Sequence, residues 1–382
     1  MIRRPICPGF ALFLTVLFLS QPACAPKEGR EPSPAGAGLA PRNIIFLIGD
    51  GMSNSIVSAA RIKNGGVSGT LHLDRMPVIG MVRTSASNNL IPDSAAAATA
   101  MASGFKTYNS AIGVGPDGKK LRSILEAGMA RGMAGGLVAT TPITHATPAP
   151  FGSHVQSRRG QPDIAAELIE NKIDVLLGGG YGFFIPKSRE KSRREDERDL
   201  IAEARGAGYS VCLTRDEMKA APDGKILGLF TLGTMTTEPP EPSLTEMAVE
   251  AMRRLDRNKK GFFLMVEGSL IDSAAHEGDS AKTLDQMLKF DEAIGAALAF
   301  AEKDGRTLVV VTADHETGGL IIKGGSMDGT KLDLIWASKD HNGATVPLYA
   351  FGPGAAEFGG FKENTDIPKI FARLLGIMDY PK

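Results

Sequence analysis

Apolar runs of strand length recur along the chain, and each ends in a cluster of small or polar residues. Runs that are almost continuously apolar and β-branched predict strands buried on both faces, as in a mostly parallel sheet covered by helices. Six segments have this form: 43–52, 136–141, 174–180, 261–269, 307–316 and 346–354. Between them, 244–256 and 282–303 place apolar residues three and four apart, which predicts amphipathic helices. This alternation predicts a single α/β domain whose ligands bind beyond the carboxyl ends of the strands.

The N-terminal segment has a different pattern. Arg3 and Arg4 precede the apolar run 10–19. That run is about half as long as a bilayer span requires, but its length suits the core of a signal peptide. We therefore expect residues 1–24 to be a leader, and the protein to be exported to the periplasm, the cell envelope or the medium.

Two kinds of processing fit the end of this leader. Ala23 and Ala25 satisfy the small-residue rule of ordinary signal cleavage, whereas a bacterial lipoprotein signal would make Cys24 a lipidated first residue attached to the membrane. The sequence leaves both open. Residues 25–41, which are rich in Pro, Gly and Ala, predict a flexible linker. The globular catalytic domain is then expected to span 42–382.

Composition narrows the possible partners. The 43 basic and 43 acidic residues cancel, so nothing in the charge balance favours a nucleic-acid partner. Removal of the leader leaves Cys212, joined by Cys24 only if that residue becomes the lipidated first residue, which makes a structural disulfide unexpected even in an oxidising compartment. We expect Cys212 to be a buried apolar residue, and the charged run 187–199 to be a solvated helix or loop.

Candidate chemistry lies at the ends of the predicted strands. Asp50 stands between Gly49 and Gly51 directly after the first strand, so that the backbone can turn and project the carboxylate, although Asp in this setting is also typical of a simple tight turn. Glu267 ends another strand. Asp272 and His276 follow it four residues apart, which places them on one face of a helical turn, as two ligands of one cation or as a surface pair.

Histidines accompany carboxylates at two further positions. Asp314 and His315 follow the run 307–312, and both can face one site only if the strand has ended there, as Gly318 and Gly319 suggest. His341 lies in the loop before the strand at 346–354. Imidazole nitrogens mixed with carboxylates are ligands that suit Zn²⁺.

A serine provides a candidate nucleophile. Ser94 follows Asp93 at the start of an Ala-rich helix, where a serine is usually only an N-cap, but where free N–H groups also favour a phosphate. Thr147, together with Glu267 and Asp50, would offer oxygen ligands of the kind that Mg²⁺ prefers. Arg158 could donate two parallel hydrogen bonds to a phosphate.

Six motifs occur in the order seen in alkaline phosphatases. They are IGDGM (48–52), DSAAAAT (93–99), THATPA (144–149) with SRR (157–159), VEGSLID (266–272) with His276, TADHE (312–316), and the late His341. From Asn43 to its C-terminus the chain therefore resembles the alkaline phosphatase family. The resemblance implies a three-layer α/β/α fold with a large, mostly parallel central sheet flanked by helices.

The resemblance also implies roles for individual residues. Ser94 looks like the nucleophile and Arg158 like the phosphate-binding arginine. The implied ligands are Asp272, His276 and His341 for one zinc, Asp50, Asp314 and His315 for a second zinc, and Asp50, Thr147 and Glu267 for a magnesium. Asp93, His145 and Ser273 would surround the phosphate and the magnesium. His145 is the residue of animal members, where enterobacterial members have Asp, and Ser273 stands where the family shows Lys, His or Trp.

The expected function is metal-dependent hydrolysis of phosphate monoesters through a phosphoserine, by an enzyme that could be a homodimer. Two alternatives stay open. One is a phosphodiesterase or sulfatase of the same superfamily, although Arg158, Thr147 and Glu267 favour monoesters. The other, from a different class, is a phosphate- or metal-binding envelope lipoprotein without turnover. His72 and His154 have no assigned role and are expected to be structural.

Overall fold

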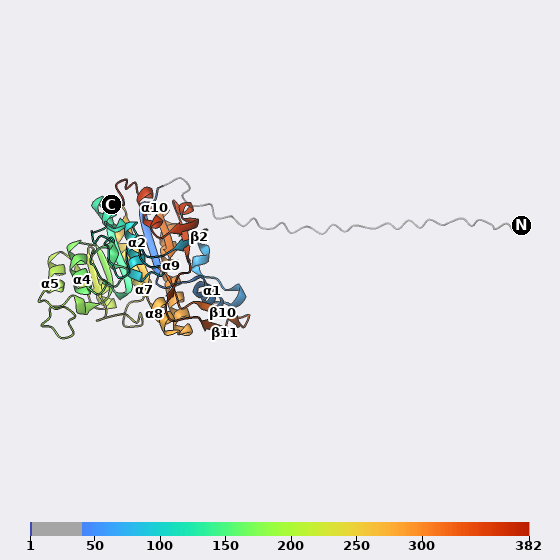
Figure 1. Ribbon diagram of the computed structural model, residues 1–382. Coiled ribbons are helices and arrows are strands. Elements are labelled where there is room, and N and C mark those ends of the chain that lie inside the picture. Colours follow the sequence, from blue (N-terminus) through green and yellow to red (C-terminus); the bar gives the residue numbers. More distant parts are fainter. Residues whose placement is uncertain (2–39, 382) are drawn as a thin grey trace. The chain divides into compact units, whose positions relative to one another are not determined.

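The computed structural model describes Met1 and residues 40–381 (Figure 1). The chain divides into two units, 1–33 and 34–382, and every described helix and strand belongs to the second. The predicted leader, with Cys24, and nearly all of the predicted linker 25–41 lie outside the described residues.

A ten-stranded sheet forms the centre of the second unit, in the order β14-β2-β13-β8-β1-β7-β3-β4-β6-β5. Every neighbouring pair is parallel except the two pairs that involve β13. The strands are β1 (Asn43–Gly49), β2 (Val78–Arg83), β3 (Ala134–Pro142), β4 (Val175–Gly179), β5 (Ser210–Cys212), β6 (Ile226–Leu229), β7 (Phe262–Gly268), β8 (Thr307–Thr312), β13 (Val346–Phe351) and β14 (Gly360–Glu363). The predicted large, mostly parallel sheet is confirmed.

Two short antiparallel ribbons complete the strands. They pair β10 (Leu320–Gly325) with β11 (Leu332–Trp336), and β9 (Glu316–Thr317) with β12 (His341–Asn342). Because β13 runs against the other strands, its amino end lies at the edge where β1, β7 and β8 have their carboxyl ends. His341, which precedes β13, reaches the same edge as the residues that follow the parallel strands.

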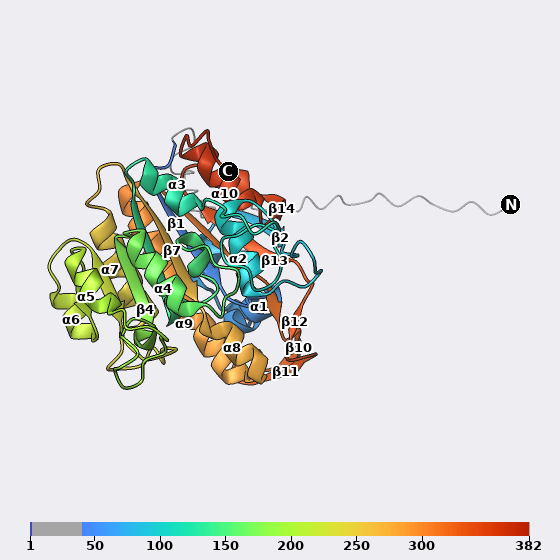
Figure 2. The same cartoon turned by 60° about the vertical axis from the view of Figure 1, so that its left-hand side comes forward.

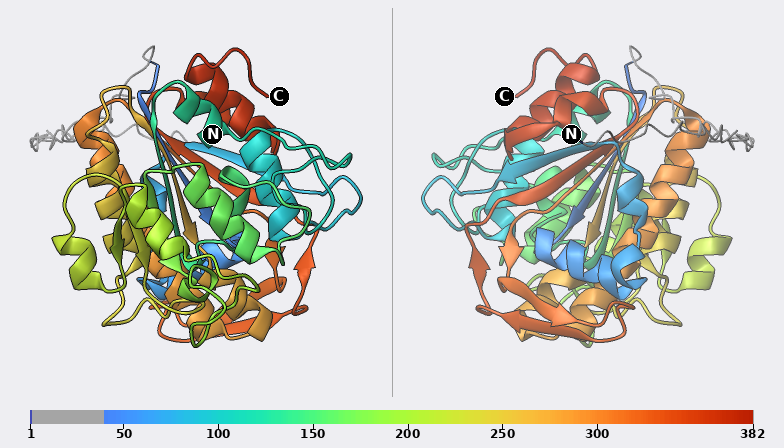
Figure 3. Two further views of the ribbon diagram at one scale, coloured as in Figure 1. Left: turned by 90° about the vertical axis from the view of Figure 1, so that its left-hand side faces the viewer. Right: turned by 90° about the vertical axis from the view of Figure 1, so that its right-hand side faces the viewer.

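Helices cover both faces of the sheet (Figures 2 and 3). They are α1 (Asn54–Lys63), α2 (Ser94–Ser103), α3 (Ile124–Ala130), α4 (Gln161–Glu170), α5 (Leu200–Gly206), α6 (Arg215–Ala220), α7 (Leu244–Leu255), α8 (Leu270–Glu277), α9 (Ser280–Asp304) and α10 (Asp366–Leu374). Single 3-10 turns are η1 (Gly66–Ser68), η2 (His72–Arg75), η3 (Ala149–Phe151), η4 (Tyr181–Phe183) and η5 (Ala355–Phe358). The predicted helices 244–256 and 282–303 correspond to α7 and α9.

Two adjacent phenylalanines of β7 show how the layers are built. Phe262 packs edge-on against Phe300 of α9, and Phe263 packs edge-on against Phe371 of α10, with ring centroids 5.8 Å apart in both pairs. Successive residues of a strand point to opposite faces, so α9 and α10 cover opposite sides of the sheet. The predicted three-layer α/β/α architecture is confirmed.

Two expectations about single segments have different outcomes. Cys212 is buried, as expected. The charged run 187–199 forms a loop, but the expectation that it is simply solvated is wrong for Arg194, which is buried and donates to Asp196 and to two backbone carbonyls. In the part of the chain that the structure describes, no helix is long and apolar enough to cross a membrane.

Candidate active site

Three buried carboxylates meet where β1, β7 and β8 end. Asp50 directly follows β1, Glu267 is the next-to-last residue of β7 and Asp314 lies just beyond β8, and each is at most 1% exposed. Gly51 has φ of 70°, and a Cβ at this position would lie 2.7 Å from the Thr317 hydroxyl. Its amide donates to Asp314 Oδ1 at 3.1 Å. A glycine after Asp50 is therefore required for the close approach of these loops.

Ser94 is the first residue of α2, but it is not the N-cap. The cap is Asp93, whose carboxylate accepts a hydrogen bond from the amide of Ala96 at 3.0 Å. The usual role of a serine at the start of a helix, that of N-cap, therefore does not apply to Ser94. The Ser94 hydroxyl, 2% exposed, lies 3.2 Å from His315 Nε2. Because Asp93 performs the capping, the hydroxyl is available at the positive end of the helix.

His315 lies between two of the carboxylates. Its Nε2 is 3.5 Å from Asp50 Oδ1 and 3.2 Å from Asp314 Oδ2. Burial lowers the pKa of His315, although the charge of Asp314 opposes the shift. A neutral imidazole has a lone pair to offer, and Asp50, Asp314 and His315 lie close enough together to hold one metal ion.

A second group forms between α8 and β12. Asp272 Oδ1 is 3.3 Å from His276 Nε2 and 3.6 Å from His341 Nε2, and the two histidine nitrogens are 3.1 Å apart. His315 also approaches this group, with its ring stacked on His341 at a centroid distance of 3.5 Å. As predicted, Asp272 and His276 lie on the same face of α8.

Backbone carbonyls orient both of these histidines. His276 Nδ1 contacts the carbonyl of Lys339, and His341 Nδ1 contacts that of Pro92 at 3.0 Å. A carbonyl can only accept, so each ring carries its proton on Nδ1 and directs Nε2 towards Asp272. This is the usual arrangement of metal-binding histidines.

A third group is richer in oxygen. Asp50, His145 and Glu267 each have a ligand atom within 4.8 Å of the others. Thr141 and Ser269 form a pair of hydroxyls 3.2 Å apart, and Thr141 Oγ1 lies 3.4 Å from Glu267 Oε2. Thr141 thus contacts one oxygen of Glu267, and the other oxygen has no hydrogen-bond partner.

Burial and mutual repulsion shift the pKa values of this cluster. Burial, then the charges of Asp314 and Asp272, raise the pKa of Asp50 well above its usual range. Burial is also the main cause that raises the pKa of Glu267 to about 7. Burial, followed by the charge of Arg158, lowers the pKa of His145 to about 4. The carboxylates are thus held close together at a free-energy cost that bound cations would remove.

The donor set fits metal ions. Four buried side-chain oxygens of the cluster have no hydrogen-bond partner among the described residues: Asp50 Oδ1, Thr147 Oγ1, Glu267 Oε1 and Asp314 Oδ2. Buried polar atoms are nearly always paired, and an unpaired one is costly. Three of these atoms are carboxylate oxygens, which accept only, so cations are the partners that would satisfy them together.

Arg158 stands beside the helix that carries Ser94. Its guanidinium donates to Asp93 Oδ2 at 3.2 Å and lies 3.1 Å from His145 Nε2. The side chain is 26% exposed, so part of the fork faces solvent. Ser273 is half-buried on α8 next to Asp272.

Sequence reasoning missed several polar residues of the cluster. Thr317 donates to Asp272 Oδ1 at 2.6 Å, while Thr141 and Ser269 contact Glu267. Each of these hydroxyl residues is close in sequence to a predicted motif. Threonine and serine are so common there that only their three-dimensional contacts distinguish them.

The fold and this cluster define a class of α/β/α proteins with a candidate metal centre at the carboxyl ends of the strands. The sequence model of the alkaline phosphatase family matches residues 41–334. Alkaline phosphatase 4 of Bacillus subtilis is 37% identical over 418 aligned positions, which cover 87% of this chain and 88% of that protein. The chain therefore belongs to the alkaline phosphatase family, whose members are phosphomonoesterases.

Solved structures agree with this assignment. The alkaline phosphatase of the Antarctic bacterium TAB5 matches with a TM-score of 0.81 at 34% identity, covering 88% of this chain and 99% of that one. The Thermus thermophilus alkaline phosphatase matches with a TM-score of 0.82 at 26% identity, covering 94% and 97%. The predicted family, fold class and enzyme class are confirmed.

Proposed function

We propose that the protein hydrolyses phosphate monoesters through a phosphoserine at Ser94, with two zinc ions and one magnesium ion as cofactors. The observation that carries this proposal is the set of unpartnered buried oxygens close to the Ser94 hydroxyl. Family membership supports the reaction. A mutant of the TAB5 enzyme has Mg bound in its M3 site, which supports a metal centre that includes magnesium.

The proposed ligand sets are those that the family resemblance implies, and the magnesium set contains Thr147 where the structure groups His145 with Asp50 and Glu267. We assign Asp272, His276 and His341 to one zinc, Asp50, Asp314 and His315 to the other, and Asp50, Thr147 and Glu267 to magnesium. Mixed nitrogen and carboxylate ligands suit Zn²⁺, and oxygen ligands suit Mg²⁺. When bound, the ions would supply Lewis acidity and neutralise the charge that develops on the attacking and leaving oxygens.

The reaction has two steps at Ser94. First its Oγ loses a proton to water and bonds to phosphorus while the ester P–O bond breaks, and the departing alkoxide takes a proton and leaves as the alcohol. Water then attacks the phosphoserine, the P–Oγ bond breaks, and Oγ regains a proton as inorganic phosphate is released. The N-terminus of α2 favours the phosphate dianion in both steps.

Arg158 gives the site its preference for monoesters. A monoester has three non-bridging oxygens, and the guanidinium can donate two parallel hydrogen bonds to them. A diester lacks one of these oxygens. Arg158→Ala is expected to lower kcat/KM for monoesters roughly ten- to a hundredfold while affecting diesters less. Arg158→Lys should rescue poorly, because a point charge cannot replace the fork.

The phosphoserine can be trapped directly. Incubation with inorganic phosphate at acidic pH, where hydroxide for the second step is scarce, should leave phosphate on the peptide that contains Ser94. The same preparation is assayed with a monoester, a diester and a sulfate ester after its metals have been quantified. The absence of an adduct, or a higher kcat/KM for the diester or sulfate ester, would overturn the proposal.

We further propose that residues 1–24 direct export, that 25–41 act as a linker and that 42–382 are the catalytic domain. The charge pattern of the leader supports export, and Cys24 supports lipid attachment. Metabolic labelling with a fatty acid, compared between the natural chain and Cys24→Ser, tests the attachment. A homodimer is proposed as the assembly, and sedimentation of the mature protein tests it.

A further inference from the structure

The segment that leads to Arg158 is held by a buried histidine. We propose that His154 and Glu126 form a positioning pair that holds the guanidinium of Arg158 at the phosphate-binding end of α2. This inference rests on the proposed role of Arg158. His154 and Glu126 contact none of the candidate metal ligands, and the sequence predicts only a structural role for His154.

Both ring nitrogens of His154 are engaged. Nδ1 lies 2.8 Å from the carbonyl of Gly113, and Nε2 lies 2.8 Å from Glu126 Oε1. The side chain is 8% exposed. The backbone amide of His154 also donates to the carboxylate of Glu167 on α4. The residue is thus fixed from α3, from α4 and from the loop at Gly113.

Backbone hydrogen bonds transmit this fixed position to Arg158. Val155 and Ile112 exchange two bonds of 2.9 and 3.0 Å, and the amide of Arg158 donates to the carbonyl of Ser110 at 2.7 Å. The amide of Ser110 donates in turn to both carboxylate oxygens of Asp93, at 3.0 Å each. Segments 110–113 and 154–158 therefore form one strip that ends on the residue capping α2.

Gly113 shows how closely the strip is packed. Its φ is 58°, and a Cβ there would lie 2.2 Å from the carbonyl oxygen of Ser153 and 2.7 Å from His154 Nδ1. Neither contact is possible for a real Cβ, so only glycine lets the loop approach the ring. The position of His154 is fixed by packing as well as by its hydrogen bonds.

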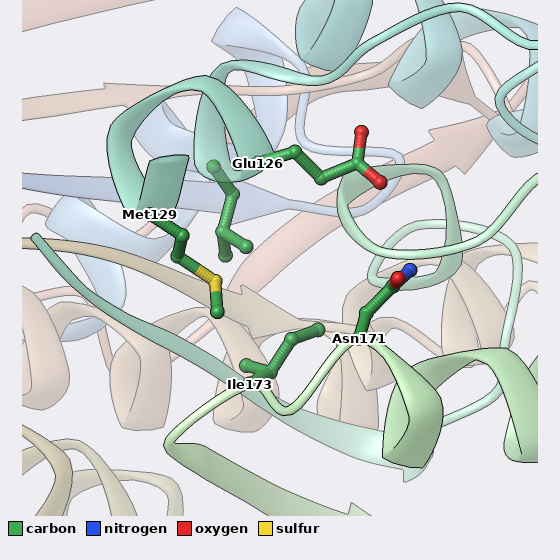
Figure 4. A pocket seen from close by; sticks show the side chains of 5 residues that line it. Glu126, Met129, Asn171 and Ile173 are labelled. Atoms are coloured by element: carbon green, nitrogen blue, oxygen red, sulfur yellow. The ribbon is translucent and has the colours of Figure 1, made fainter. Parts of the chain in front are cut away.

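Charge reinforces the pair. Burial acts to lower the pKa of His154, but the hydrogen bond and charge of Glu126, with a smaller contribution from Glu167, raise it above its usual value. Glu126 also caps its own helix by accepting from the amide of Ser123 at 2.8 Å. Glu126 lines one pocket together with Met129 and Ile173, and Figure 4 shows its carboxylate pointing away from these two side chains.

A positioning role of His154 and a purely stabilising role predict different effects of its substitution on phosphate binding and on the two ester reactions. If His154 acts through Arg158, its loss weakens phosphate binding and the monoester reaction but spares diesters. A change of stability alone would alter the amount of active enzyme and would affect all substrates equally. The inhibition constant of inorganic phosphate separates the two, since it does not depend on enzyme concentration.

The experiment is a double-mutant cycle in the full-length metal-loaded enzyme. His154→Gln, Glu126→Leu and the conservative Glu126→Gln are made with Arg158 and with Arg158→Ala. The matched control is Glu250→Leu, which removes the carboxylate of a similarly buried pair with Arg254 on α7. Readouts are kcat and KM for a monoester and a diester, and the inhibition constant of phosphate.

With Arg158 present, His154→Gln and Glu126→Leu should raise the phosphate inhibition constant and lower monoester kcat/KM by about three- to tenfold. Glu126→Gln, which keeps an acceptor for the ring, should fall between these variants and the natural enzyme. In the Arg158→Ala background the same substitutions should change neither quantity, because coupled residues are not additive. The control should leave both quantities unchanged in either background.

Two results would overturn the inference: equal losses for monoester and diester, or undiminished losses in the Arg158→Ala background. If His154→Gln yields no folded enzyme, the partly exposed Glu126 still provides the test through its two variants. A failure of the proposed function looks different. In that case Arg158→Ala itself leaves phosphate inhibition and the monoester preference unchanged.

Discussion

The two ends of strands β1 and β8 carry buried polar clusters of opposite character. At the amino ends, Asn43 donates to Thr307 Oγ1 at 3.1 Å and to Asp304 Oδ2 at 3.3 Å, and accepts from the amide of Phe262 at 3.2 Å. The hydroxyl of Thr307 donates to Asp304 at 2.6 Å. At the carboxyl ends, Asp50 and Asp314 each keep a buried oxygen without a hydrogen-bond partner.

The difference lies in the balance of donors and acceptors. The amino-end cluster combines an amide, a hydroxyl and a carboxylate, so each group finds a complement and the cluster stabilises the fold by itself. The carboxyl-end cluster concentrates carboxylates, which repel one another when no cation lies between them. The same strands therefore carry a self-sufficient polar cluster at one end and, at the other, the cluster that we propose binds cations.

The largest expected effect is at the carboxyl end. Ser94→Ala should lower kcat by about a thousandfold or more while the protein stays folded, because Asp93 and not Ser94 caps α2. Ser103→Ala, at the other end of the same helix, is the matched control. It removes a buried hydroxyl that donates to the carbonyl of Thr99 and accepts from the amide of Phe105, and should leave kcat unchanged. Steady-state kinetics with circular dichroism would decide, and full activity of Ser94→Ala would refute the nucleophile.

Removal of bound metal ions should affect only the cluster at the carboxyl ends of the strands. After dialysis against a chelator we expect activity to fall about a hundredfold or more, and to return with added Zn²⁺ and Mg²⁺. Each ion at a hundred times its Kd stabilises the folded state by about 2.7 kcal/mol, so the three proposed ions together should raise Tm by roughly 10 °C. Calorimetry with and without the ions measures the shift. An unchanged Tm and undiminished activity in chelator would contradict the metal centre.

The amino end should respond in stability only. Asn43→Ala removes three hydrogen bonds of a fully buried side chain and leaves Asp304 and Thr307 short of partners. We expect it to lower the free energy of unfolding by about 1–3 kcal/mol. Urea unfolding measures this loss, and kcat/KM of the folded fraction should match that of the natural enzyme. A drop in kcat/KM would show that the two ends are coupled.

The smallest expected effect is a pH-dependent change in the free energy of unfolding. It concerns a third polar cluster, the pair of His154 and Glu126, whose polar atoms are paired. The pKa of His154 is raised and that of Glu126 is lowered. Their pair therefore contributes its full stability between the ordinary pKa values of the two groups, about 4.5 and 6.5. The contribution is lost as pH rises through the raised pKa of His154.

The corresponding measurement compares the natural enzyme with His154→Gln. The difference in their free energies of unfolding should be about 1–2 kcal/mol near pH 6 and smaller at pH 9. Urea unfolding across this range, with both proteins in the same metal state, provides the values. A difference that grows with pH would show that the imidazole is neutral in the folded protein.

Much of the fold could be predicted from the sequence. Continuous apolar runs predicted β1, β7 and β8, and three- and four-residue spacing predicted α7 and α9, because burial imposes these periods directly on the residues. The motifs likewise predicted which carboxylates and histidines would gather, since the carboxyl ends of parallel strands share one edge. The ligand set of each metal and the processing of Cys24 stay predictions.

Tertiary structure decided the rest. The reversal of β13 brings His341 to the edge where Asp314 lies, and nothing in the sequence around 341 indicates strand direction. The capping of α2 by Asp93, the burial of Arg194 and the engagement of His154 by Glu126 all depend on partners that are distant in sequence or in a neighbouring turn. The sequence alone determined which segments are apolar and where reactive groups occur. Which polar atoms find partners, and which are left for metal ions, was decided only by three-dimensional packing, because a hydrogen bond needs both groups in place.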